Sequence, residues 1–258
     1  MRSQVIIQEL WKIISTQLAA NANNPRFTDR NKVHSRYREM STKLLAIETS
    51  TEACSAALWI DGTITEEFVR IPNRHSELLL PMIDKVLAQG QTTLKQVDVI
   101  ALGRGPGAFT GLRIGAGIAQ GLAFGREIPV VTISSLQALA QGYRANQVLA
   151  AIDARMDQIY WACYHQFEGS TLPIGDERLT FPQQLSVPQG GVWLGVGSGW
   201  DRYHVAMRTA LPSVSLELIP DACPRAAHVA QLGALEYGYG RALPAAQAQP
   251  YYLRNQVV

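Results

Sequence analysis

Residues 103–115 read GRGPGAFTGLRIG and form the most unusual stretch of the chain. A buried strand, Val97–Leu102, is predicted before this glycine-rich turn, and a helix from about Thr110 to Phe124 after it. Glycines permit the positive φ angles of a tight turn, and the N-terminus of the following helix favours anions. The strand, turn and helix together indicate an α/β protein with a candidate binding loop at this turn.

Two common nucleotide motifs fit this turn poorly. A phosphate P-loop needs a Lys-Ser or Lys-Thr pair after its glycines, and none is present here. A dinucleotide fingerprint matches loosely through Gly103, Gly105 and Ala108, but it also needs an acid at the end of the next strand. That strand ends in Ile133-Ser134-Ser135, so the sequence disfavours both interpretations.

The predicted helix carries small residues at every fourth position. They fall on two lines, Gly111, Gly115 and Ala119 on one and Gly117, Gly121 and Gly125 on the other. Each glycine inside a helix costs about 1 kcal/mol relative to alanine, so close packing must offset several of them. Packing against the chain's own sheet and packing against a partner helix both fit this pattern.

Hydrophobic periodicity predicts further elements on both sides of this segment. The predicted strands are Leu44–Glu48, Ser55–Ile60, Ile64–Val69, Ile128–Ile133, Leu149–Asp153, Gln158–His165 and Val192–Val196. The predicted helices are Ser76–Gln89, Leu136–Tyr143, His204–Thr209 and Ala226–Tyr237. Asp61-Gly62 predicts a hairpin, and Pro81 predicts a kink or a later start of its helix. Segment 166–190 contains three prolines and is predicted to be an irregular connection.

The opening strand recurs later in the chain. LLAIE at 44–48 aligns with LAAID at 149–153, and each apolar run ends in an acid and is followed by a β-rich segment. Buried strands resemble one another, so a short repeat alone is weak evidence. With the similar order of elements, it predicts two related α/β lobes.

Composition and charge exclude several classes of protein. Of the 258 residues, 47% are hydrophobic and 17% charged, which excludes a disordered chain. Residues 1–39 hold seven Lys/Arg and three Asp/Glu, net +4, so the total of +2 leaves −2 for the remainder. That remainder has no Lys/Arg run of the kind that grips several phosphates. No apolar run approaches the ~20 residues of a membrane span, so no membrane association is predicted.

The ends of the two aligned strands hold the candidate polar site. Glu48, Thr49 and Ser50 follow the first strand, and Asp153 and Arg155 follow its counterpart. Acid and hydroxyl groups there can face a nucleotide, although such groups are also often solvated or cap turns. His75, just before a predicted helix, is more typical of a helix start or a surface position than of a ligand.

No metal or disulfide framework is predicted. Cys54, Cys163 and Cys223 are far apart and match neither a zinc spacing nor paired cysteines, which fits a reducing cytosol. Residues 1–39 differ from the rest, and Met40 directly precedes the first strong strand. We therefore expect Met40 to be the functional start and 1–39 to be an extension.

Four segments resemble the TsaB (YeaZ) family, a bacterial subunit needed for N6-threonylcarbamoyladenosine (t6A) at position 37 of tRNA. They are LAIETST at 45–51, GRGPGAFTGLRIG at 103–115, AIDARMD at 151–157 and YLRN at 252–255, in the family's order. The resemblance covers roughly residues 40–258. It implies the two-lobed actin/Hsp70/sugar-kinase-like (ASKHA) fold with duplicated lobes, here 40–135 and 136–258, with the C-terminal tail returning to the first lobe.

The resemblance also implies a non-catalytic role in the cytoplasm. The catalytic relative, TsaD, carries two metal-ligating histidines four residues apart, where this chain has Ser135 and Leu139. Actin-like ATPases favour Asp and Gly in the first phosphate loop, where this chain has Glu48 and Ser50. We therefore expect a degenerate nucleotide site at Glu48, Thr49, Ser50, Asp153 and Arg155, no resident cofactor, and at most weak or shared nucleotide binding at a subunit junction.

The implied partners are TsaD, the ATPase TsaE and, for the chain alone, a second copy, with tRNA reached only indirectly. The implied interface uses the first-lobe helices 76–89 and 110–124. Its candidate residues are His75, Leu79, Ile83, Phe109, Gly111, Leu112, Arg113, Ile114 and Gly115. On this interpretation Gly115→Leu disrupts pairing and leaves a folded monomer. The alternatives are an active actin-like ATPase or kinase and, with least support, a peptidase.

Overall fold

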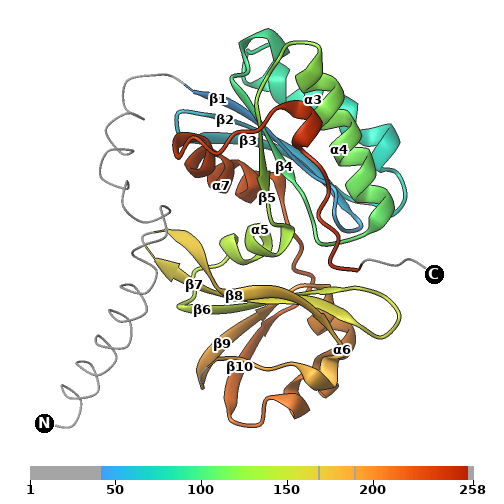
Figure 1. The fold of residues 1–258 in the computed structure, drawn as a ribbon, viewed down its shortest axis with the longest axis vertical. Coiled ribbons are helices and arrows are strands. Elements are labelled where there is room, and N and C mark those ends of the chain that lie inside the picture. Colours follow the sequence, from blue (N-terminus) through green and yellow to red (C-terminus); the bar gives the residue numbers. More distant parts are fainter. Residues whose placement is uncertain (1–41, 168, 189, 255–258) are drawn as a thin grey trace, which may run out of the picture. The chain divides into compact units, whose positions relative to one another are not determined.

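The computed structural model describes residues 42–254 apart from 168 and 189, within one compact unit, Thr42–Val258. The expected extension over residues 1–39 and the expected start at Met40 lie outside the described residues. Two five-stranded sheets dominate the described part of the chain (Figure 1).

The first sheet has the order β3-β2-β1-β4-β5. Its strands are β1 (Lys43–Glu48), β2 (Ala53–Ile60), β3 (Thr63–Arg70), β4 (Val99–Gly103) and β5 (Val130–Ile133). Strands β1, β2 and β3 are antiparallel neighbours, whereas β4 and β5 continue the sheet in parallel. Asp61 and Gly62 both have positive φ in the turn between β2 and β3, which confirms the predicted hairpin.

The second sheet repeats this topology, with the order β10-β9-β6-β7-β8. Its strands are β6 (Gln147–Asp153), β7 (Ile159–Phe167), β8 (Ser170–Thr180), β9 (Gly191–Val196) and β10 (Val214–Ile219). Three antiparallel strands are again followed by two parallel ones. The matching orders confirm the duplicated, two-lobed actin-like fold, and the sheets lie on either side of the predicted boundary at residue 135.

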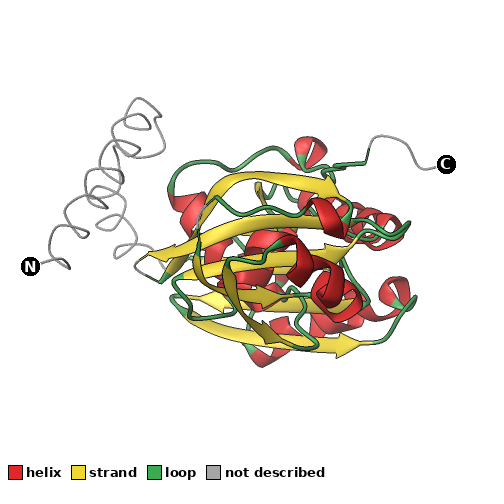
Figure 2. Ribbon diagram, turned by 90° about the horizontal axis from the view of Figure 1, so that it is seen from below, coloured by secondary structure: helices red, strands yellow, loops and turns green. Residues whose placement is uncertain are grey.

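Alternating side chains give each sheet two buried faces. Leu45 and Ile47 of β1 face α3 (His75–Gln89) and α4 (Phe109–Phe124), whereas Leu44 and Ala46 face α7 (Ala226–Gly238). In the second sheet, β6 likewise faces α5 (Ser135–Gln141) on one side and α6 (Ser198–Ala210) on the other. Figure 2 shows these helices in red against the yellow strands.

The end of the chain packs on the first sheet. Helix α7 contacts β1, β2 and β4, and Leu243 bridges to Val130 of β5. Gln120 Nε2 of α4 donates to the Ala248 carbonyl oxygen at 3.1 Å. The return to the first lobe therefore includes α7 as well as the tail (Figure 1).

Three local predictions differ from the structure. Helix α3 runs through Pro81 without a break. Pro81 has no N–H to donate to the Glu77 carbonyl, but both residues are exposed, so this carbonyl is not buried without a partner. Segment 166–190 is not irregular throughout, since it contains β8, whose position at the sheet edge tolerates Pro173. Strand β10 was not predicted, although its alternating sequence VSLELI carries the signal.

Candidate functional site

Glu48, at the end of β1, is enclosed inside the first lobe. It is 1% exposed, and its carboxylate accepts bonds from the Ser50 backbone N–H at 2.6 Å and from Ser135 Oγ at 2.8 Å. Burial raises the pKa of Glu48, and the hydrogen bonds from Ser50 and Ser135 offset only part of that shift. The acid therefore holds neighbouring loops together, and none of its polar contacts faces solvent.

The glycine-rich turn packs on the chain's own backbone. The Ala108 backbone N–H, just before α4, donates to the Ser50 carbonyl oxygen at 2.6 Å. A Cβ at Gly107 would overlap that same carbonyl, and a Cβ at Gly103 would overlap the Glu48 carboxylate. One of the amides that a phosphate could use at this helix start, that of Ala108, is thus taken by the Ser50 carbonyl oxygen.

Helix α4 has an inner glycine line, Gly111 and Gly115, that contacts Thr49. A Cβ at Gly111 would overlap the Thr49 carbonyl oxygen, and one at Gly115 would overlap Thr49 Oγ1. Thr49 Oγ1 also donates to the Gly111 carbonyl oxygen at 2.9 Å. The sequence prediction that Gly115→Leu leaves a folded monomer conflicts with this packing.

The second-lobe candidates form a separate ion cluster at the end of β6. Asp153 binds the Arg155 backbone N–H at 2.8 Å, and its carboxylate is 3.2 Å from the guanidinium groups of both Arg155 and Arg202. Ser198 Oγ, at the start of α6, accepts from the Asp153 backbone N–H at 3.1 Å. Asp153 is nearly covered while Arg155 is 77% exposed, so the accessible charge of this cluster is positive.

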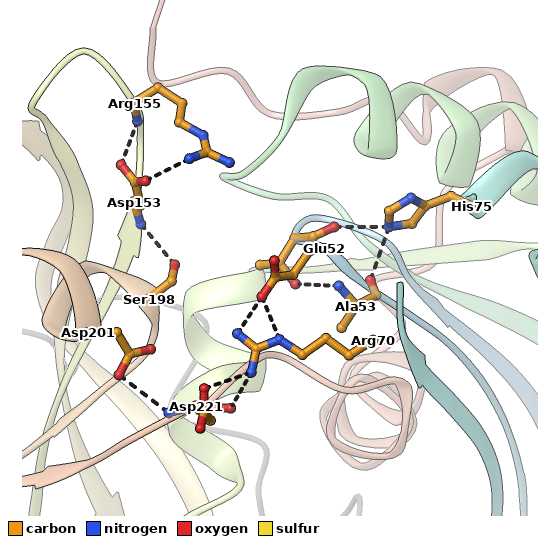
Figure 3. Close-up of polar contacts among 10 residues, drawn as sticks. Glu52, Ala53, Arg70, His75, Asp153, Arg155, Ser198, Asp201 and Asp221 are labelled. Carbon is orange, nitrogen blue, oxygen red and sulfur yellow. Dashed lines mark hydrogen bonds and ion pairs between the residues drawn. The ribbon is translucent and has the colours of Figure 1, made fainter. Parts of the chain in front are cut away.

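Polar contacts also connect the first lobe to the chain that follows the second sheet. Arg70 of β3 forms ion pairs with Glu52 and with Asp221, the latter at 3.1 Å, and Asp221 belongs to the connection from β10 to α7 (Figure 3). The Asp221 backbone N–H donates to Asp201 at 3.3 Å, and burial raises the pKa of Asp201. Sequence reasoning missed all four residues, because single charges without a spacing pattern carry no signal.

His75 is a buried structural residue at the start of α3. Its Nε2 lies 2.9 Å from the Thr51 carbonyl oxygen and 3.2 Å from that of Ala53. Nε2 therefore carries the proton and donates to the loop that follows β1. This geometry ties α3 to the loop and leaves His75 6% exposed.

The structure divides the other interface candidates between core and surface. Leu79, Ile83 and Leu112 are at most 2% exposed, so they pack in the chain's own core and have no surface for a partner. Phe109 and Arg113 are exposed and Ile114 is half-buried. The interface itself stays a prediction, which now rests on the exposed face of α4.

Helix α4 also has an outer glycine line, Gly117 and Gly121. Both are exposed, and a Cβ at either position would have no heavy atom of another described residue within 4 Å, apart from its neighbours in the helix. Half-buried Ile118 and Leu122 flank them, and Phe124 is 79% exposed. Intramolecular packing thus accounts for the inner line and leaves the outer line unexplained.

Ser135 and Leu139 stand at the positions compared with metal-ligating histidines. Both lie in α5 and are fully buried. Over residues 42–254 as described, no group of three His, Cys, Asp or Glu side chains could hold a metal ion. In the same part of the chain, no helix is long and apolar enough to cross a membrane.

Comparisons with known proteins agree with this architecture. The family model "TsaD: tRNA N6-adenosine threonylcarbamoyltransferase" matches residues 70–192. The chain is 40% identical over 231 residues to the tRNA threonylcarbamoyladenosine biosynthesis protein TsaB of Escherichia coli, covering 83% of this chain and 96% of that protein. It is 39% identical to the same-named protein of Haemophilus influenzae, over 83% and 94%. The solved structure of YeaZ from Pseudomonas aeruginosa matches with a TM-score of 0.77 and 42% identity, over 82% of this chain and all of that one.

Proposed function

This chain belongs to the TsaB family of tRNA threonylcarbamoyladenosine biosynthesis proteins, and we propose that it acts there as a non-catalytic scaffold in the cytoplasm. It binds the catalytic TsaD subunit through the outer face of α3 and α4. The ATPase TsaE joins this pair, and a second copy of the chain occupies the same face when TsaD is absent.

The outer glycine line carries this proposal. Gly117 and Gly121 each cost the helix about 1 kcal/mol relative to alanine, and among the described residues no packing against a Cβ at either position accounts for glycine there. A ridge without side chains lets a second helix approach closely. The half-buried Ile114, Ile118 and Leu122 beside the ridge provide apolar area for such a contact.

The family comparison supports the choice of TsaD as the partner. The TsaD model matches residues 70–192, a range that contains both α3 and α4. A TsaD protein with the corresponding helix pair can present a similar face. Two related surfaces can then pair about an approximate twofold axis, as in an isologous dimer.

The candidate polar residues support a role without catalysis. Glu48 is buried among hydrogen-bond donors, the Ala108 amide is used by Ser50, and Leu139 cannot bind a metal. These contacts fill the first-lobe site with the chain's own atoms. They argue against the alternative of an independent ATPase or kinase, for which calorimetry with ATP and Mg²⁺ would show strong binding by the chain alone.

Reconstitution tests the proposal. We expect the chain to co-purify with a TsaD-type partner and to be required for t6A formation by that partner and TsaE. The matched variant is Gly121→Leu, with Val205→Leu as the control, because Val205 is exposed on the second-lobe helix α6. Full t6A formation without this chain would overturn the scaffold role.

A further inference from the structure

Residues 250–254, the C-terminal strap, connect the two lobes. The Tyr251 backbone N–H donates to the Arg104 carbonyl oxygen in the glycine-rich turn at 2.8 Å. The Arg104 guanidinium lies 4.4 Å from the centre of the Tyr251 ring. The strap is therefore fixed beside the start of α4.

Tyr252 extends the outer face of α4. Its ring centre is 5.2 Å from that of Phe109, and Arg113 Nε donates to its hydroxyl at 3.4 Å. Phe109 and Tyr252 are each 36% exposed, and the Arg113 guanidinium lies 3.6 Å from the Phe109 ring centre. Because residues four apart share a helix face, Phe109 and Arg113 continue the line of Gly117 and Gly121.

We infer that Tyr252 forms part of the surface that binds the catalytic partner and that Arg254 positions it. This inference rests on the proposed function, whose partner face is continuous with Tyr252. Within the described residues, Arg113 has ring and hydroxyl contacts but no ion pair. The partner segment that fits is a helix with small residues opposite the glycine line and a carboxylate opposite Arg113.

Arg254 fixes the strap to the second lobe. Its Nη2 donates to Gln158 Oε1 at 2.6 Å and lies 3.4 Å from the Arg155 carbonyl oxygen. Leu253 packs against the core between α5 and the second sheet. The turn that Arg254 binds directly follows Asp153, so Tyr252, Leu253 and Arg254 join the second-lobe ion cluster to the proposed partner surface.

The first test removes the Tyr252 ring. Tyr252→Ser is expected to weaken binding of the full chain to the TsaD-type partner about tenfold or more, as is typical of a buried interface aromatic. Phe181→Ser is the control, because Phe181 is a 46% exposed ring on the second lobe. Calorimetric titration with the partner measures the affinity of both variants. Equal affinities would show that Tyr252 does not contribute to partner binding.

The second test separates positioning from stability. Arg254→Gln is expected to weaken partner binding about threefold or more at an unchanged melting temperature, because it uncouples Tyr252 from the second lobe. Arg254→Lys retains a donor for Gln158 and is expected to restore most of the affinity. Wild-type affinity for Arg254→Gln would overturn the positioning role.

These outcomes are distinct from failure of the scaffold function. If the wild-type chain binds the partner and supports t6A formation while both strap variants behave like wild type, the strap inference is wrong and the scaffold stands. If the wild-type chain does not bind the partner, the proposed function itself is wrong.

Discussion

Helix α4 carries Gly111 and Gly115 on one face and Gly117 and Gly121 on another, and their surroundings differ completely. The first pair lies against Thr49, where a Cβ would overlap backbone or side-chain oxygen. The second pair faces open space. Glycine spacing alone therefore does not identify an interface, because the same four-residue repeat serves internal packing on one side and is free for a partner on the other.

The largest expected effect is from Gly115→Leu on the inner face. A leucine there must displace Thr49 and the loop after β1, so we expect a loss of about 3 kcal/mol or more in the free energy of unfolding. Urea denaturation followed by circular dichroism measures it. A folded variant of wild-type stability would mean that the inner face is not closely packed.

The sequence could predict the features that depend on local patterns, but not those that depend on contacts between distant residues. The apolar repeats at 44–48 and 149–153 predicted the duplicated lobes, because buried strands need only local hydrophobicity. The two glycine lines were also evident. Which line faces the sheet depends on the rotation of α4 about its axis, and this is set by contacts with Thr49, 62 residues away.

The rotation of each helix about its axis also explains why some interface candidates are buried. Leu79, Ile83 and Leu112 were chosen as apolar residues on the right helices, but apolar residues at helical spacing usually face the core. Phe109 and Arg113 are candidates that the structure leaves exposed, whereas Tyr252 and Arg254 were not among the interface candidates. Their contacts join parts of the chain about 100 or more residues apart, and no local pattern signals them.

A smaller effect is expected from Thr49→Val, which keeps the shape of the inner contact and removes its hydrogen bond. The Thr49 hydroxyl donates to the Gly111 carbonyl in a buried position, so its loss should cost about 1–2 kcal/mol. Urea midpoints of Thr49→Val and of the exposed control Thr110→Val provide the comparison. Equal midpoints would show that the bond adds nothing to the inner face.

Glu48, which precedes Thr49 in the chain, is expected to make the stability of the first lobe depend on pH. Its pKa is raised in the folded state, so its protonated form adds stability below the unfolded-state pKa of about 4.3, and this is lost as pH rises through the folded value. Glu48→Gln stays neutral and should gain stability relative to wild type as pH increases above about 4.3. Melting temperatures at several pH values test this, and a constant difference would contradict the raised pKa.

Gly121→Leu on the outer face should have the smallest effect on folding and should act instead on assembly. Its side chain enters open space, and leucine is the better helix former, so the isolated chain should keep its stability or gain up to about 1 kcal/mol. If a partner helix approaches the glycine line, the same leucine holds it away. The chain's self-association, measured by sedimentation at micromolar concentration, should then fall together with partner binding. Gly121→Ala is the graded control, since its single methyl group should impair assembly less than leucine. A stable Gly121→Leu variant that assembles like wild type would remove the distinction between the two faces of α4 as far as partners are concerned.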